Sequence, residues 1–173
     1  MRKVYIVLTY TGTILSRLVR GYTGKEYAHV SLALDKELKE MYSFGRLNPY
    51  NPFIGGFVHE SIDYGTFKRF YKTKTKIYSL EVNDEQFNKI KDIINDINEN
   101  KNEYHFNIIG IFLAAVNLHL KRERHFYCAE FVKYVLDNSD LKVDLPDVVR
   151  PDDFNKLKNI KEIYTGVLKQ YKI

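Results

Sequence analysis

The segment "RERHFYCAEFVKYVLDN", residues 122–138, contains the only cysteine in a chain of 173 residues. From this cysteine onward, Phe131, Val132 and Val135 recur at the spacing of one helix face, which predicts a helix that begins at Cys128. The cysteine then starts the apolar face and points toward the core. A helix N-terminus stabilises negative charge and so lowers the pKa of a thiol placed there. This position is typical of a nucleophile.

The cysteine also has an ordinary interpretation, because free cysteine is among the most buried residue types and often packs as a small apolar side chain. A partner residue is needed to choose between the two. His29 is the candidate, since it lies in "YAHVSLAL", residues 27–34, which has the composition of a strand. Alternation places His29, Ser31 and Ala33 on one face of that strand. Their small neighbours leave room for the helix that carries Cys128.

The other four histidines are expected at the surface: His59 in a loop, and His105, His119 and His125 at or near helix ends. The sequence has no Cys-x-x-Cys and no His-x-x-x-His pair, and one cysteine cannot form a structural zinc site by itself. We therefore expect no metal site and no cofactor.

The composition predicts one packed domain over residues 1–173, since apolar residues make up 45% of the chain. One cysteine excludes an internal disulfide. The net charge of +5 is spread along the chain, which favours a solvated surface and no nucleic-acid partner, with a basic nucleic-acid-binding domain as the minor alternative. The apolar run at residues 4–8 is shorter than the roughly 7–15 residues of a signal-peptide core. No run reaches the ~18–20 residues of a membrane span, so we expect a cytoplasmic protein without stable membrane insertion. The oligomeric state is not predicted.

The predicted elements begin with strands, continue with helices and end with a strand. The strands are expected at 3–11, 27–35, 40–46, 75–82 and 161–171, and the helices at 11–24, 83–100, 106–118 and 128–137. Asn83 and Gln86 resemble a capping box, and "DKELK" reads as a hairpin turn. Asp152 or Asp153 is expected to cap a short helix in a second proline-marked loop. This order predicts an α+β fold with an antiparallel β-sheet packed against helices.

The segment at residues 47–61 has two prolines and two glycines, which predicts a loop. It contains large apolar side chains beside a flexible glycine pair: Tyr50, Phe53, Ile54, Phe57, Gly55 and Gly56. One interpretation is a hydrophobic wall or lid beside the site, which would favour an apolar, lipid-like or bulky acyl substrate. The other is a loop folded over the edge of the core.

Three short segments, "AHVSLAL", "MYSFG" and "FYCAEFV", together resemble the circularly permuted branch of the NlpC-type, papain-like superfamily. In that branch the histidine strand precedes the cysteine helix, and the YiiX-like hydrolases and the lecithin retinol acyltransferase group belong to it. The Tyr-Cys-Ala-Glu-Phe-Val segment at 127–132 is similar to the latter group's Asn-Cys-Glu-His-Phe-Val. The resemblance covers roughly residues 1–155 in element order and implies a permuted papain-like (NlpC-like) fold.

The resemblance also implies a chemistry. Cys128 would be the nucleophile and His29 the general base, in hydrolysis or acyl transfer at an amide or ester through a cysteine thioester. The substrate would be a small acyl compound, a peptide or a lipid. Tyr42 and Tyr127, together with the aromatic residues at 50, 53 and 57, are the expected substrate contacts.

The family's third catalytic member is a polar His or Glu on the strand after the histidine strand. In this sequence that position falls near Ser43, while the nearest carboxylate, Glu40, lies close to the turn. We therefore predict Ser43 as the residue that orients the imidazole. Because serine cannot offset the charge of an imidazolium, an alternative stays open: a catalytically weak or inactive peptide- or lipid-binding module on the same fold.

Overall fold

The structure is a computed structural model that describes residues 1–173 except His119. The side chains of Leu15, Pro52, Phe53 and Ala115 also lie outside the described part. The surface position expected for His119 therefore falls outside the described residues.

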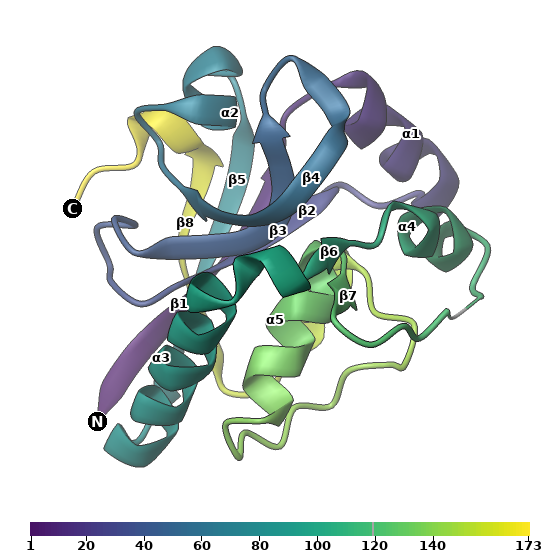
Figure 1. The fold of residues 1–173 in the computed structure, drawn as a ribbon. Helices are drawn as coiled ribbons and strands as arrows, with labels where there is room; N and C mark the ends of the chain where they lie inside the picture. Colours follow the sequence, from purple (N-terminus) through teal and green to yellow (C-terminus); the bar gives the residue numbers. More distant parts are fainter. Residues whose placement is uncertain (119) are drawn as a thin grey trace.

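A six-stranded sheet forms the body of the fold, in the order β4-β3-β2-β1-β5-β8, with every neighbouring pair antiparallel (Figure 1). The strands are β1 (Arg2–Tyr10), β2 (His29–Ala33), β3 (Met41–Asn48), β4 (Asn51–Glu60), β5 (Lys74–Val82) and β8 (Ile160–Val167). A separate parallel pair joins β6 (His105–Phe106) to β7 (His125–Phe126). The predicted α+β class, with an antiparallel sheet packed against helices, is confirmed.

The α-helices are α1 (Ile14–Thr23), α2 (Gly65–Arg69), α3 (Asp84–Glu99), α4 (Ile108–Ala115) and α5 (Cys128–Asp137). Short 3-10 turns cover Lys101–Glu103, Pro151–Lys156 and Leu168–Gln170. In Figure 1, α3 and α5 lie side by side below the sheet, and α1 and α4 lie together at its right-hand end. Within the described residues, no helix is both long and apolar enough to cross a membrane.

Local sequence signals set the helix ends. The capping box predicted for α3 is confirmed: the backbone N–H of Gln86 donates to Asn83 Oδ1 at 2.8 Å, and that of Asn83 donates to Gln86 Oε1 at 3.0 Å. Helix α1 ends where Gly24 adopts φ 63°, and its N–H donates to the carbonyl of Arg20. In the later proline-marked segment, the backbone N–H of Arg150 donates to Asp153, so the expected acidic cap is also present.

Helix α5 packs on the sheet face that carries Val30 and Leu32. Its Phe131 ring contacts those of Phe44 and Phe57, with centroids 5.5 and 5.7 Å apart. We expected the helix on the opposite face, beside Ser31 and Ala33, and that expectation is wrong. The larger aliphatic side chains remove more apolar surface from water when the helix covers them.

The segment at 47–61, predicted as a loop, is mostly strand. Strands β3 and β4 form a long hairpin that turns at residues 49–50. Strand β4 is the terminal strand of the sheet, where a proline near its start is tolerated. The glycine pair does not provide flexibility: a Cβ added at Gly55 would collide with the ring of Phe106, so this glycine permits close packing.

Candidate active site

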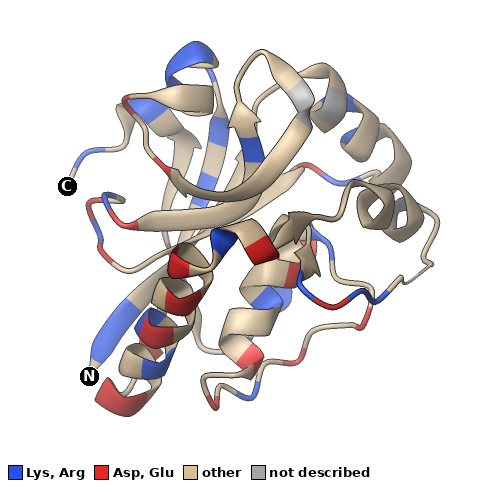
Figure 2. Cartoon of the chain, in the orientation of Figure 1, with Lys and Arg blue, Asp and Glu red and all other residues tan. Residues whose placement is uncertain are grey.

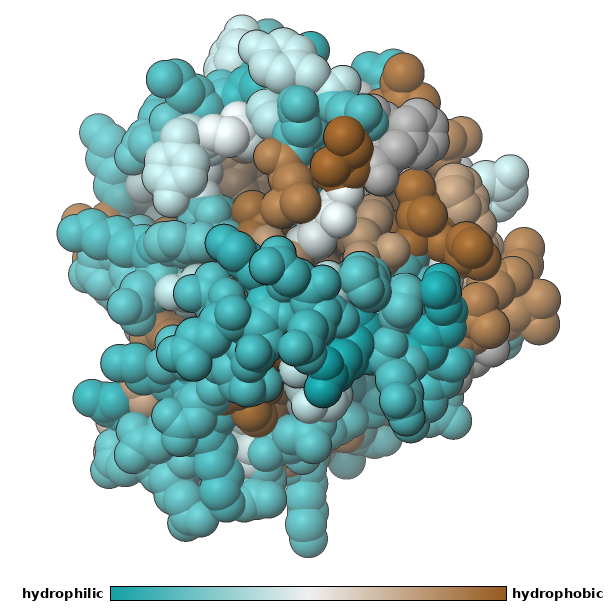
Figure 3. Space-filling view, in the orientation of Figure 1, coloured by the Kyte–Doolittle hydropathy of each residue, from teal (hydrophilic) through white to brown (hydrophobic). Residues whose placement is uncertain are grey.

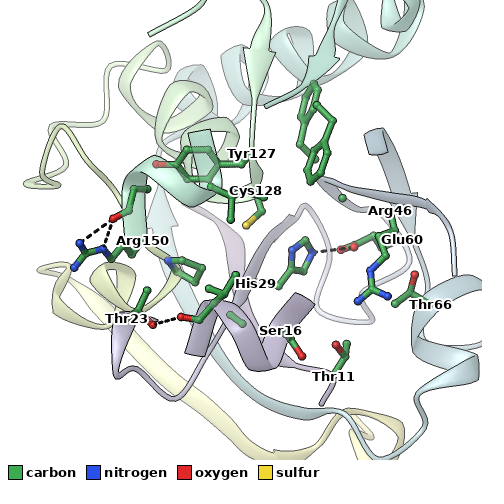
Figure 4. A pocket seen from close by; sticks show the side chains of 18 of the residues that line it. Thr11, Ser16, Thr23, His29, Arg46, Glu60, Thr66, Tyr127, Cys128 and Arg150 are labelled. Atoms are coloured by element: carbon green, nitrogen blue, oxygen red, sulfur yellow. Dashed lines mark hydrogen bonds and ion pairs between the residues drawn. The ribbon is translucent and has the colours of Figure 1, made fainter. Parts of the chain in front are cut away.

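The candidate site lies where the ends of three elements meet. Cys128 is the first residue of α5, His29 the first residue of β2, and Glu60 the last residue of β4. Figure 4 shows their side chains converging, with the imidazole between the sulfur and the carboxylate. The thiol is largely buried, at 7% relative exposure. Although α5 covers the other sheet face, its first residue reaches His29 because both lie at the ends of their elements.

His29 and Glu60 form a shielded hydrogen-bonded pair. Nε2 of His29 lies 2.9 Å from Oε1 of Glu60, and the two side chains are 21% and 10% exposed. The Ser31 hydroxyl donates to the second carboxylate oxygen, Oε2. Since both carboxylate oxygens are engaged, the carboxylate is fixed in place and in turn fixes the plane of the imidazole.

The electrostatics of this pair favour an imidazolium. Burial alone lowers the pKa of His29, but the charges of Glu60 and Cys128 and the hydrogen bonds of the imidazole to both outweigh it and raise the pKa to about 10. For Glu60, burial raises the pKa, while the charge of His29, the hydrogen bonds from His29 and Ser31 and a smaller effect of the nearby Ser43 hydroxyl bring it below its usual range. At neutral pH the pair is therefore a carboxylate and an imidazolium.

Cys128 interacts with the other side of the same ring. A side-chain hydrogen bond with Cys128 contributes to the raised pKa of His29. Because Nε2 is held by Glu60, the nitrogen available to the sulfur is Nδ1. In space, the Cys128 thiol, the His29 imidazole and the Glu60 carboxylate follow one another as a nucleophile, a base and a residue that orients the base do.

The prediction of Ser43 as the orienting residue is wrong in its geometry. The Ser43 hydroxyl is buried, makes no hydrogen bond of ordinary geometry, and acts only weakly on the nearby Glu60 carboxylate. The side chains of His29, Ser43 and Glu60 all lie close to Gly45. A Cβ added at Gly45 would lie 3.3 Å from His29 Cε1 and from Ser43 Oγ. The same Cβ would lie 3.6 Å from Glu60 Oε1. The short serine stays beside the carboxylate, and the longer Glu60 side chain reaches the imidazole.

A cavity of about 90 Å³ opens above these residues. It is roomy enough for several water molecules, at roughly 10–15 Å³ each in this measure. Its walls come from β2, β3, α1, α4, β6 and the residues before α5: Ser16, Val19, Phe44, Phe106, Ile111, Ala114 and Tyr127, among others. Tyr127, one of the predicted substrate contacts, therefore lies at the cavity. Its hydroxyl donates to the carbonyl of Val149 at 2.8 Å.

Tyr42, Tyr50 and Phe57, three further predicted substrate contacts, do not line the described walls of this cavity. Tyr42 stacks on Phe57 and His59, with ring centroids 5.8 and 4.9 Å away. Phe57 is buried in the core, and Tyr50 is exposed beneath the guanidinium of Arg69, which lies 3.8 Å from the ring centroid. These three predictions fail because the hairpin turns the side chains away from the site. The side chain of Phe53 lies outside the described residues.

His59 lies in a strand, not in the predicted loop, and its Nε2 is 2.6 Å from the carbonyl oxygen of Lys39. His105 and His125 are paired between β6 and β7, with ring centroids 5.0 Å apart. In the described part of the chain, His, Cys, Asp and Glu residues form no group of three or more that could hold a metal ion.

Two arginines also line the cavity. Nη2 of Arg46 donates to Thr13 Oγ1 at 2.6 Å, and burial together with the neighbouring charge of Arg69 lowers the pKa of Arg46. Nε and Nη2 of Arg150 both donate to the carbonyl oxygen of Ala114, at 3.2 and 2.9 Å. Arg150 therefore joins the end of α4 to the segment before the 3-10 turn at Pro151–Lys156. The guanidinium groups of Arg46 and Arg150 make part of the cavity wall positively charged.

A crystal structure of the metalloprotein YiiX from Escherichia coli O157:H7 superposes with a TM-score of 0.53. The alignment covers 96% of this chain and 98% of that chain. The chain has the fold of YiiX. At 14% sequence identity, the similarity to YiiX shows the fold alone, which is the fold that the sequence segments resembled.

Searches against protein-family models and against curated proteins gave no match for this sequence. YiiX is a metalloprotein, whereas the described residues of this chain contain no group of three or more His, Cys, Asp or Glu side chains placed to hold a metal ion. We therefore derive no step through a metal.

Proposed function

We propose that the protein is a cysteine hydrolase or acyltransferase that acts on an amide or ester bond through a thioester at Cys128. The observation that carries the proposal is the His29 imidazole held between the Cys128 thiol and the Glu60 carboxylate, inside a cavity. The helix start places the dipole of α5 behind the sulfur, where it stabilises a thiolate.

In the proposed reaction, the proton of the Cys128 thiol already resides on His29, and the Cys128 thiolate attacks the acyl carbon of the substrate. The imidazolium then donates this proton to the leaving amine or alcohol, the bond to that group breaks, and a thioester remains. In the second half, the now neutral His29 removes a proton from water or from an acceptor alcohol or amine. The resulting nucleophile attacks the thioester, which releases the acyl product and restores the thiolate beside the protonated His29. Glu60 holds the imidazole in position and stabilises its charged form.

The backbone amide of Cys128 is the donor that we assign to the oxyanion. It lies at the first position of α5, where the helix supplies no carbonyl for it. An amide at this point donates toward the carbonyl oxygen that becomes the oxyanion, and one such donor is worth about 10²–10³ in rate in other enzymes.

The cavity favours a small acyl, peptide or lipid substrate over a nucleic acid. Its described walls are largely aliphatic and aromatic, and its two arginines suit a polar or anionic end group on such a substrate. A reactive free thiol suits a reducing compartment such as the cytoplasm. The alternative of an inactive binding module was based on the lack of a carboxylate beside the imidazole. Glu60 supplies that carboxylate, so the catalytic proposal is preferred.

The test is to trap the thioester. The protein is incubated with a panel of activated acyl esters and aminoacyl amides, and intact mass spectrometry records acyl adducts before and after hydroxylamine. We expect a hydroxylamine-sensitive adduct on the wild-type chain, none on Cys128→Ala, and acylation slowed by at least about 100-fold in His29→Gln.

His59→Gln is the matched control, because it removes an imidazole on β4 that contacts the Lys39 carbonyl and stacks on Tyr42, neither of which lines the cavity. It should acylate at the wild-type rate. Hydrolysis that persists in Cys128→Ala would rule out the mechanism, and so would a wild-type chain that accepts no acyl group from the whole panel.

A further inference from the structure

The outer faces of α1 and α4 are unusually apolar for a protein surface. Ile14, Leu18 and Tyr22 recur every four residues along α1, and Ile109, Phe112 and Val116 form a similar stripe on α4. We call these six residues the apolar face. Each is between 45% and 79% exposed. Apolar residues at helical spacing normally point into a core, so two such stripes in solvent indicate a surface that meets a partner.

The two stripes belong to one continuous surface. Helices α1 and α4 contact each other, and Figure 3 shows apolar side chains gathered over them at the right of the molecule. The apolar character continues beyond α4, where Leu118 is 57% exposed. The rest of the visible face is mainly hydrophilic.

Positive charge accompanies the apolar face. Helices α1 and α4 contain no Asp or Glu, and α1 carries Arg17 and Arg20. The segments that follow the two helices add the cations Lys25, Lys121 and Arg122, next to the acidic residues Glu26 and Glu123. Acidic residues are concentrated elsewhere: Figure 2 shows them along α3, on the opposite side of the view from α1 and α4. The surface therefore combines insertable apolar side chains with unbalanced positive charge.

We infer that the apolar face docks onto an anionic membrane surface. Interfacial binding of this kind uses apolar side chains at the acyl boundary and cations at the headgroups. Both helices supply apolar side chains, and the cations lie on α1 and in the segments that follow α1 and α4. No membrane-spanning helix is required. The occupant is a lipid surface, because anionic headgroups would pair with the cations and the acyl layer beneath them would bury the apolar side chains of the two stripes.

The location also relates docking to the candidate active site. The inner faces of the same helices, through Ser16 and Val19 of α1 and Ile111 and Ala114 of α4, line the cavity that contains Cys128. Docking would thus place the cavity next to the lipid surface. The inference does not depend on the proposed chemistry, since the docking residues and the catalytic residues are different.

Vesicle sedimentation tests the inference. Wild-type protein and Cys128→Ala are centrifuged with vesicles of phosphatidylcholine alone, and with vesicles of equal parts phosphatidylcholine and phosphatidylglycerol. Both proteins should pellet with the anionic vesicles, and binding should weaken as salt is added. Binding by Cys128→Ala separates docking from catalysis, so either proposal can fail without the other.

The double variant Leu18→Glu, Phe112→Glu should bind the anionic vesicles at least about tenfold more weakly. The matched control, Tyr71→Glu with Ile173→Glu, adds the same charge at two exposed apolar residues outside the face and should stay within about twofold of wild type. If the first variant does not fold, as judged by circular dichroism, Arg17→Gln with Arg20→Gln serves instead. It should also lose about tenfold, with a shallower salt dependence.

Three results would overturn the inference. The first is no pelleting of wild type with anionic vesicles, and the second is equal pelleting of the face variant. The third is a wild-type dimer that Leu18→Glu, Phe112→Glu converts to a monomer without any vesicle binding, which would assign the face to a second copy of the chain.

Discussion

Replacing Glu60 with Gln removes one charge from the candidate active site while keeping the size of the side chain. The carboxylate oxygen lies 2.9 Å from His29 Nε2, and both side chains are well shielded from water. At an effective dielectric constant of about 20, two unit charges at this separation attract by about 6 kcal/mol. At about 1.4 kcal/mol for each pKa unit, this equals about four units. The charge of Glu60 is thus large enough to account for the raised pKa of His29 against the opposing effect of burial.

We expect the pKa of His29 to fall by about four units in Glu60→Gln, from about 10 to below 7, as followed by NMR titration of the imidazole. Cys128 then loses the cation beside its sulfur, so alkylation by iodoacetamide at pH 7 should slow by at least about tenfold. Because the chain contains one cysteine, intact mass spectrometry reports alkylation at this site alone.

Glu81→Gln is the control, since it removes an exposed carboxylate 3.7 Å from the Lys3 ammonium. It should change neither quantity. If Glu60→Gln keeps the wild-type alkylation rate and a His29 pKa within half a unit of wild type, the carboxylate does not control the imidazole and the electrostatic reasoning is wrong.

Three further predictions concern the surroundings of the site. Gly45→Ala places a methyl group 3.3 Å from His29 Cε1, so it should destabilise the fold by about 1–3 kcal/mol and slow alkylation of Cys128; unchanged urea unfolding and alkylation would contradict this. Arg150→Ala removes two hydrogen bonds of a charged donor to the Ala114 carbonyl, which keeps the backbone hydrogen bond from Asn117. It should cost about 1–3 kcal/mol in urea unfolding, whereas Lys158→Ala, at an exposed site, should cost little. The difference in the free energy of unfolding between wild type and His29→Gln should be largest near pH 6.5 or just below, and should decrease as the pH rises toward about 10. The reason is that the folded state holds the imidazole proton more tightly than the unfolded state does. A difference that grows with pH would refute the sign.

The sequence predicted those features that depend on local patterns. The capping box of α3, the strand that carries His29 and the helix that begins at Cys128 all follow from spacing and residue type over a few positions. The sheet face that α5 covers could not be predicted, because both faces of β2 offered a plausible surface. The choice depends on Phe44 and Phe57, which come from strands paired later in the fold.

Glu60 was missed for a related reason. Prolines and glycines at 49–56 predict a loop, and this signal obscures the strand alternation of the residues that follow them. The structure pairs Glu60 with Met41, which places its side chain on the same sheet face as His29 and Ser31. The sequence holds one signal for Glu60, which follows Phe57 by three positions. On a strand whose Phe57 side chain is buried, alternation places the Glu60 side chain on the opposite sheet face. Its contact with His29 depends on the register of two strand pairings, which no short motif encodes.

The position of Glu60 at the end of β4 gives local stability a direct role in activity. Strand β4 terminates the sheet and is paired within it to β3, and terminal strands open more easily than central ones. Fraying of the last residues of β4, after Phe57, would remove the carboxylate from the imidazole while Phe131 of α5 kept its contacts with Phe44 and Phe57. Reactivity of Cys128 should therefore decline at lower urea concentrations than the global unfolding transition. The thiol would then report on the fraying of a strand to which it does not belong.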